Sequence, residues 1–293
     1  MMRFMLFVGA NLSVVLLLSI VMWLFDVDQY LATQGLAGEL YGLLIMAAVI
    51  GFTGSFISLA LSKWMAKRAM RVTVIEQPRS ALEQWLVSTV RQHANRVGIG
   101  MPEVGIFEAP QPNAFATGMN RHHALVAVSS GLLQMMDQDE VEAVIGHEIS
   151  HIANGDMVTM GLLQGVLNTF VVFLSYVVGL FVDRVLLKNE RGFGVGYYAA
   201  SIITQLVLGV LAAMIAAWFS RRREFRADQG GANLAGSGKM ISALQALQRR
   251  QQVAELPGQL AAFGIAGGGI GAGLRRLLMS HPPLEERIAA LRQ

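Results

Sequence analysis

The sequence predicts an α-helical integral membrane protein with four transmembrane helices and a mostly helical soluble part that includes a small β-sheet. Two observations lead to this prediction. Apolar residues make up 54% of the 293 residues and charged residues only 15%, whereas soluble domains average about 45–50% apolar and about 25% charged. Four long runs contain no charged residue at all, namely residues 4–25, 40–61, 157–182 and 192–220.

Each of these runs is long enough to cross a bilayer, which takes about 20 apolar residues in a helix. The rest of the chain is too short to bury four such helices as the core of a soluble domain. The first run exceeds the about 7–15 residues of a signal-peptide core, and no clear A-x-A site follows it, so we interpret it as an uncleaved anchor. The third and fourth runs contain Gln164, Asn168 and Gln205, which indicates tilted, shallow or cavity-lining helices.

Lysine and arginine near the spans predict the orientation of the chain. They cluster directly after the second and fourth runs, as Lys63, Lys67, Arg68, Arg71, Arg221, Arg222, Arg223 and Arg226. The loop after the first run contains acidic residues and no basic residue. We therefore expect both termini and both soluble segments in the cytoplasm. The predicted domains are a membrane hairpin (1–61), a first soluble part (62–156), a second hairpin (157–220) and a second soluble part (221–293).

The two soluble parts together equal one ordinary domain, so we expect them to fold as one body. Helical spacing predicts a helix over 81–97. Short strands are expected at 104–107, 114–117 and 125–128, between turn residues.

A further helix is expected after Asp137, which with Glu140 resembles a capping box, and it should end at Asn154 and Gly155. In the second soluble part, residues 221–247 are expected to be helical. The glycine-rich residues 264–273 should form a loop, and a last helix should begin near Pro283.

Composition also excludes several functions. The chain has no cysteine, so disulfide scaffolds, thiolate catalysis and cysteine-ligated metals are excluded. The net charge of +3 is too small to indicate nucleic-acid binding. The basic residues beside apolar runs indicate a lipid bilayer as partner.

The motif His147-Glu148-Ile149-Ser150-His151 lies on the helix expected after Asp137. Histidines four residues apart on a helix can reach one metal ion, and Glu148 can reach water beside that ion. H-E-x-x-H is therefore typical of zinc peptidases. The alternative is a pair of surface histidines on an amphipathic helix.

A catalytic zinc needs a third protein ligand. One zincin pattern places a histidine six residues after the second, where this chain has Met157. The other places a glutamate on a later helix, and Glu224 fits, because an even number of spans separates it from His151. By spacing alone, Glu224 could also be a solvated carboxylate. Asp228, one turn on, could accept a hydrogen bond from a ligand histidine, and Asp156 competes for that role.

At these residues the chain resembles the HtpX group of membrane-bound zinc metallopeptidases. The resemblance covers most of the chain, and its motifs are residues 112–118, 146–157, 223–228 and 281–287. It implies a zincin-like (gluzincin) domain in which one Zn²⁺ per chain is bound by His147, His151 and Glu224, with Glu148 as the catalytic base.

The resemblance also implies a heat-stress-linked protease of the bacterial inner membrane that clears damaged membrane proteins. It places His281 near the site, as a candidate donor to the oxyanion; the alternative is a residue that only precedes a helix. Residues Asn113, Ala114 and Phe115 are candidates for an edge strand that pairs with an extended substrate, or for an ordinary strand.

Two other functions compete with a zinc endopeptidase at the membrane surface. An intramembrane protease would need the motif inside a span, but acidic residues precede the motif on its own helix. A non-enzymatic adaptor with a structural zinc would not need Glu148. The remaining histidines, His93, His122 and His123, have no ligand-spaced partner and are expected at the surface.

Overall fold

The computed structural model describes residues 37–189, 193–254 and 277–293 of the chain. The chain divides into two compact units. The first contains residues up to Ser58 together with Met160–Ala216, and the second contains Leu59–Thr159 and Ala217–Gln293. The domain boundaries inferred from the sequence, after residues 61, 156 and 220, remain predictions.

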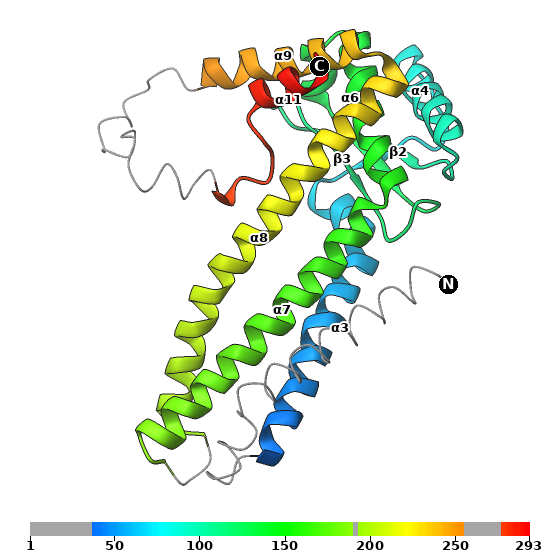
Figure 1. Cartoon of the computed structure of the whole chain (residues 1–293). Coiled ribbons are helices and arrows are strands. Elements are labelled where there is room, and N and C mark those ends of the chain that lie inside the picture. The colour runs from blue at the N-terminus through cyan, green and yellow to red at the C-terminus, as the bar shows by residue number, and fades with distance from the viewer. Residues whose placement is uncertain (1–36, 190–192, 255–276) are drawn as a thin grey trace. The chain divides into compact units, whose positions relative to one another are not determined.

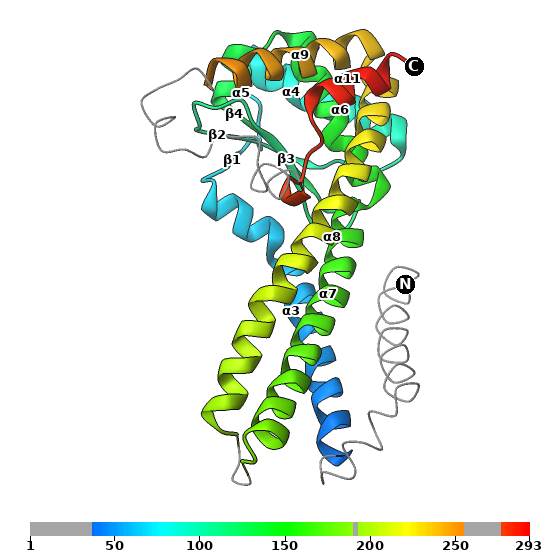
Figure 2. The ribbon, with the colours of Figure 1, turned by 60° about the vertical axis from the view of Figure 1, so that its left-hand side comes forward.

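The first unit consists of long helical stretches. They belong to α3 (Ala37–Ala69), α7 (Asp156–Leu180), its π-helical continuation η1 (Phe181–Leu186) and α8 (Val195–Ala235). Helices α3 and α7 run side by side in both views (Figure 1, Figure 2). Gly51 of α3 permits this close contact, because a Cβ atom there would lie only 2.5 Å from the hydroxyl oxygen of Thr169.

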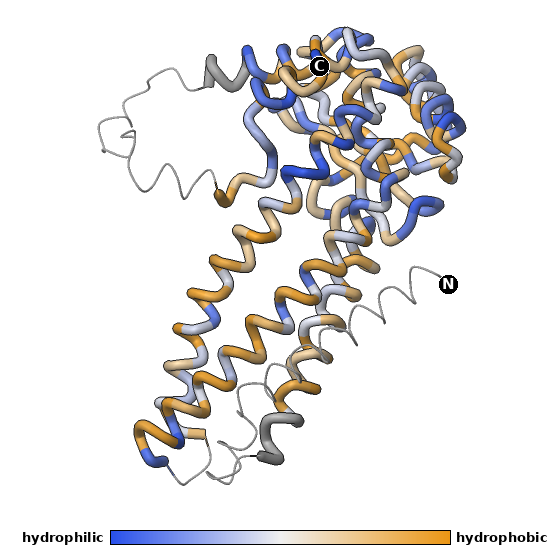
Figure 3. The backbone as a smooth tube through the Cα atoms, viewed as in Figure 1, coloured by the Kyte–Doolittle hydropathy of each residue, from blue (hydrophilic) through white to orange (hydrophobic). Residues whose placement is uncertain are grey.

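Three helices of the described residues are long and apolar enough to cross a membrane. They are Gly42–Ala69, Asp156–Leu186 and Val195–Ala235, with mean hydropathies of 2.2, 2.1 and 2.2. Figure 3 shows the apolar residues along them. The third predicted span falls within the second of these helices, and the second and fourth predicted spans overlap the other two except for their first residues, which indicates a membrane protein. The first predicted span, residues 4–25, lies outside the described residues.

The second unit contains a four-stranded mixed sheet with the order β1-β2-β4-β3. Strand β2 pairs parallel with β4, and β3 pairs antiparallel with β4, so β3 is an edge strand. The strands are β1 (Thr73–Val74), β2 (Glu103–Phe107), β3 (Ala114–Thr117) and β4 (Leu125–Ser129). The three predicted strands are confirmed to within one residue, and the two-residue β1 is too short to give a periodic signal.

Helices of the second unit begin and end at the signals that the sequence contains. Helix α4 (Ala81–Val97) has the predicted bounds. Helix α6 (Gln138–Asn154) starts with a complete capping box between Asp137 and Glu140, and ends at Gly155, whose φ of 73° is left-handed. The other helices are α5 (Ser130–Met135), α9 (Ser237–Ala254) and α11 (Leu284–Leu291).

The prediction that residues 221–247 are helical is confirmed except for one break at Gly236. Helix α8 ends at Ala235 and α9 starts at Ser237, because Gly236 between them adopts a φ of 108° that is not helical. The glycine-rich residues 264–273 lie outside the described residues.

The prediction that His93 lies at the surface is wrong. Helix α4 buries a stripe at helical spacing, and its members are Leu86, Thr89, Val90, His93 and Ala94. His93 is completely buried because it falls within this stripe. His122 and His123 are exposed, as predicted.

Candidate active site

Helix α6 positions the two motif histidines. His147 and His151 are one helical turn apart, and their Nε2 atoms lie 3.1 Å from each other. Their imidazole rings meet edge to face, with centroids 4.7 Å apart. Both Nε2 atoms therefore point toward the same point in space.

Glu224 of α8 brings its carboxylate to this point. Its Oε1 lies 3.4 Å from Nε2 of His151, and its Oε2 lies 3.6 Å from Nε2 of His147. The potential metal-ligand atoms of the three residues all lie within 4.8 Å of one another. Ligands of a tetrahedral ion with bonds of about 2.0–2.1 Å are separated by about 3.3 Å. The three side chains thus fit a single metal ion.

Close packing of α6 against α8 makes this convergence possible. Gly231 of α8 faces the backbone of α6, where an added Cβ atom would lie 3.0 Å from the backbone nitrogen of His147. A larger residue at this position would push α8 away from the histidines.

Two carboxylates fix the orientation of the imidazoles. Nδ1 of His151 donates a hydrogen bond of 2.6 Å to Oδ2 of Asp156. Nδ1 of His147 lies 2.9 Å from Oδ1 of Asp228. A proton held on Nδ1 leaves the lone pair of Nε2 free for a metal ion. The sequence left Asp156 and Asp228 as competitors for one role, whereas in the structure each contacts a different histidine.

Arg287 of α11 completes the buried charge network. Its Nε and Nη2 donate hydrogen bonds of 2.7 and 2.5 Å to the two carboxylate oxygens of Asp228. Its Nη1 lies 3.4 Å from Oε2 of Glu224. The side chains of Arg287, Asp228 and Glu224 are only 8%, 1% and 3% exposed. In the sequence, Arg287 is only the last residue of the 281–287 motif, and no local pattern there predicted its role.

These contacts decide the charge states of the site. Burial favours the neutral form of His151, but hydrogen bonds to Asp156 and Glu224 outweigh it and raise the pKa of His151 to about 9. Burial also opposes ionisation of Glu224, yet His151 and His281 hold its pKa well below the usual range. Because a ligand histidine must be deprotonated, protons and a metal ion compete for His151.

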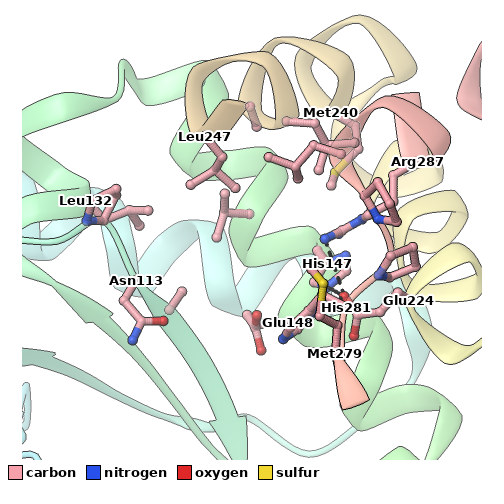
Figure 4. A pocket seen from close by; sticks show the side chains of 18 residues that line it. Asn113, Leu132, His147, Glu148, Glu224, Met240, Leu247, Met279, His281 and Arg287 are labelled. Carbon is pink, nitrogen blue, oxygen red and sulfur yellow. Dashed lines mark hydrogen bonds and ion pairs between the residues drawn. The ribbon is translucent and has the colours of Figure 1, made fainter. Parts of the chain in front are cut away.

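A cavity of about 460 Å³ opens beside the metal-ligand candidates (Figure 4). Apolar residues of α9 line one wall, and polar groups gather at the other end. The lining includes Asn113, Ala114, Leu132, His147, Glu148, Glu224, Met240, Leu244, Leu247, Met279, His281 and Arg287. In the view of Figure 4 the Glu148 side chain lies between Asn113 and His281.

His281 enters the site from the segment before α11. Its Nδ1 lies 2.7 Å from Oε2 of Glu224, while its side chain is 64% exposed. Of the candidate substrate strand, Asn113 and Ala114 line the cavity. Phe115 does not, because its ring packs on Phe107 with centroids 5.5 Å apart.

Comparison with known proteins identifies the family. The profile described as peptidase family M48 matches residues 80–293, which include every residue of the candidate site. The chain belongs to peptidase family M48. The M48 chain is therefore a metalloprotease, as its resemblance to the HtpX group indicated.

Relatives of this M48 chain carry consistent names. It is 60% identical to Protease HtpX of Thioalkalivibrio sulfidiphilus over 292 residues, which cover 100% of this chain and 99% of that protein. It is 61% identical over 292 residues to Protease HtpX homolog of Thiobacillus denitrificans, again with 100% and 99% coverage.

A solved structure shares the fold. The crystal structure of S. mikatae Ste24p superimposes with a TM-score of 0.60, at 18% identity, and the match covers 94% of this chain and 67% of that chain.

Proposed function

We propose that the chain is a zinc-dependent endopeptidase of the bacterial inner membrane that cleaves misfolded or damaged membrane proteins at the cytoplasmic face. The observation that supports this most strongly is the convergence of His147, His151 and Glu224 at a cavity that also contains the carboxylate of Glu148. Three protein ligands leave one position open, which is the arrangement of catalytic zinc sites.

Zinc at this position would supply positive charge that polarises a peptide carbonyl and makes water more acidic. Glu148 would accept a proton from the attacking water and donate it to the leaving amine. Its position supports this role, because it directly follows the ligand candidate His147, is only partly buried and lines the cavity.

His281 is our candidate for stabilising the negative charge that develops on the carbonyl oxygen. Its Nδ1 is engaged by Glu224, and in a protonated ring Nε2 remains as a second donor. A charged donor directed at a developing oxyanion stabilises the transition state more than the substrate. His281 is largely exposed and lines the cavity, so a substrate could lie beside it.

The edge strand β3 would hold the substrate. The backbone nitrogen of Ser129 donates to the carbonyl of Asn113, so the alternation of an antiparallel ladder directs the N–H and C=O groups of Ala114 and Ala116 away from β4. Ala114 also lines the cavity. An extended peptide could add to this edge through its backbone, which would give weak sequence selectivity.

The position of Glu224 suggests that the site lies close to the membrane surface. Glu224 follows the charge-free run by four residues within the single helix α8, a distance of about 6 Å along the helix axis at about 1.5 Å per residue. A similar estimate from His151 to the third span is not valid, because Gly155 interrupts the helix between α6 and α7. Basic residues after the second and fourth runs favour the cytoplasmic side.

The test is a model membrane substrate with one unfolded loop, placed on either the cytoplasmic or the periplasmic side. We expect cleavage of the cytoplasmic loop only, and faster cleavage than of the same loop in a folded form, because an extended segment must lie across the site. Tethering in the same membrane raises the effective concentration of such a loop. Equal cleavage on both sides, or cleavage of the periplasmic loop alone, would contradict the proposal.

A further inference from the structure

A short apolar segment precedes His281. Leu277, Leu278 and Met279 are 44%, 41% and 37% exposed, although they belong to the unit that contains the polar site. Single exposed apolar residues are ordinary, whereas three consecutive large ones indicate a contact with something apolar.

Hydrogen bonds from Arg221 fix the position of the segment along α8. Nη1 of Arg221 donates hydrogen bonds of 3.1 and 2.7 Å to the backbone carbonyls of Leu277 and Met279. Arg221 is the first residue after the charge-free run 192–220. The apolar segment therefore lies beside the turn of α8 at which the predicted span 192–220 ends.

A second observation supports a membrane boundary at the same turn. The guanidinium of Arg222 lies 4.4 Å from the ring centroid of Trp218, whose side chain is 48% exposed. Tryptophan is enriched at the membrane–water interface, where its ring lies at the level of the lipid headgroups. Trp218 and Arg221 are less than one helical turn apart, so both markers define one level on α8.

The same segment borders the catalytic cavity. Met279 and His281 line it, whereas Leu277 and Leu278 do not. Two side chains of the segment are thus free to contact a partner outside the cavity, while the third faces the site.

We propose that Leu277 and Leu278 insert into the interfacial layer of the bilayer and that residues 277–279 form a lipid-contacting rim of the active-site cavity. The inference rests on the proposed function, since it takes residues 192–220 as a span and the cavity as the place of cleavage. A polypeptide that leaves the bilayer beside this rim would reach the cavity over an apolar surface. The rim would thereby favour substrates that are themselves in the membrane.

The absence of cysteine from the natural chain makes a direct test possible. Leu278→Cys, labelled with an environment-sensitive fluorophore, is reconstituted in phosphatidylcholine nanodiscs with or without lipid that carries a nitroxide near the top of its acyl chains. Ala289→Cys, on the exposed face of α11, is the matched control. We expect strong quenching at position 278 and little at 289. Quenching at position 278 no greater than at position 289 would contradict the proposed lipid-contacting rim. In that case water, a soluble protein or a second copy of the chain would cover the segment instead of lipid.

A charge substitution tests the consequence for activity. Leu277→Glu and Leu278→Glu should cleave a soluble unfolded peptide at the normal rate, but should cleave a membrane-tethered substrate slower by on the order of tenfold, because the tethering advantage is reduced. Ala290→Glu on exposed α11 is the matched control for the added charge and should change neither rate.

An equal loss on both substrates, or no loss on either, would contradict the rim. Failure of the unsubstituted protein to cleave the soluble peptide would instead contradict the proposed function, and the quenching measurement would still decide whether the segment contacts lipid.

Discussion

Arg287 binds Asp228 through two parallel hydrogen bonds, of 2.7 Å from Nε and 2.5 Å from Nη2. Oδ1 of Asp228 also lies 2.9 Å from Nδ1 of His147. One carboxylate therefore joins the C-terminal helix α11 to a candidate metal ligand on α6. Since Arg287 also lies 3.4 Å from Glu224, its positive charge offsets part of the negative charge of the buried carboxylates of Asp228 and Glu224.

Removal of this arginine should weaken the metal site as well as the fold. In Arg287→Ala, Asp228 loses its charged partner, and breaking a buried ion pair typically costs about 3–5 kcal/mol of stability. We expect zinc affinity to fall by about 10–100-fold, as for other residues that orient metal ligands. Competition with a chelator measures the affinity, and thermal unfolding in detergent measures the stability.

Two further variants separate orientation from folding. Arg287→Lys keeps the charge but not the paired geometry, so it should restore most of the stability and less of the zinc affinity. Arg292→Ala, at an exposed position of the same terminal region, should alter neither. A folded Arg287→Ala protein with normal zinc affinity would show that the arginine does not position the site.

Glu224 and Asp228 should differ in their effect on metal binding. Glu224→Ala removes a ligand candidate and should lose zinc more severely than Asp228→Ala, for which we expect a loss of about 10–100-fold. Glu76→Ala, an exposed carboxylate, is the control. Metal analysis after dialysis measures the zinc content of each variant. A Glu224→Ala protein that retains zinc as tightly as the natural chain would exclude Glu224 as the third ligand.

Buried His93 should make the second unit sensitive to acid. Burial lowers the pKa of His93 below its ordinary value of 6.5, although Glu142, whose Oε1 lies 3.9 Å away, acts in the opposite direction. Neither ring nitrogen has a hydrogen-bond partner within the described part of the chain. As the pH falls below about 6.5, His93 therefore binds a proton in the unfolded chain before it does so in the folded chain. The free energy of unfolding that is present above this pH is lost progressively as the pH falls toward the lower pKa of His93 in the folded state.

The variant His93→Gln cannot take up this proton. Its melting temperature should fall less between about pH 7 and about pH 5 than that of the natural chain. His122→Gln, at an exposed histidine, should retain the natural pH dependence. Identical pH profiles for His93→Gln and the natural chain would contradict this role of His93.

Local signals in the sequence predicted much of the fold and the centre of the site. The capping box of Asp137 and Glu140, the left-handed Gly155 and the i, i+4 spacing of His147 and His151 depend on residues close in sequence, so a linear pattern contains them. The positions of three short strands also followed from the turn residues between them, although their pairing did not.

Contacts between distant segments could not be predicted in the same way. Asp228 reaches His147 only because α8 packs closely on α6, and Arg287 reaches Asp228 and Glu224 only because α11 packs on α9. Burial of His93 depends likewise on the helices and strands that cover α4. The break at Gly236 is local, but a glycine within an otherwise helical pattern does not reveal its φ.

The most direct test of the account compares metal content and proteolysis in Glu148→Gln. The substitution removes the proposed base but no proposed ligand, so the purified protein should contain about one zinc ion per chain, as the natural chain should, and should not cleave an unfolded casein-type substrate in detergent. This result would separate a zinc endopeptidase from an adaptor with a structural zinc, in which Glu148 would be dispensable. Substantial cleavage by Glu148→Gln, or a natural chain that binds no zinc, would contradict the account.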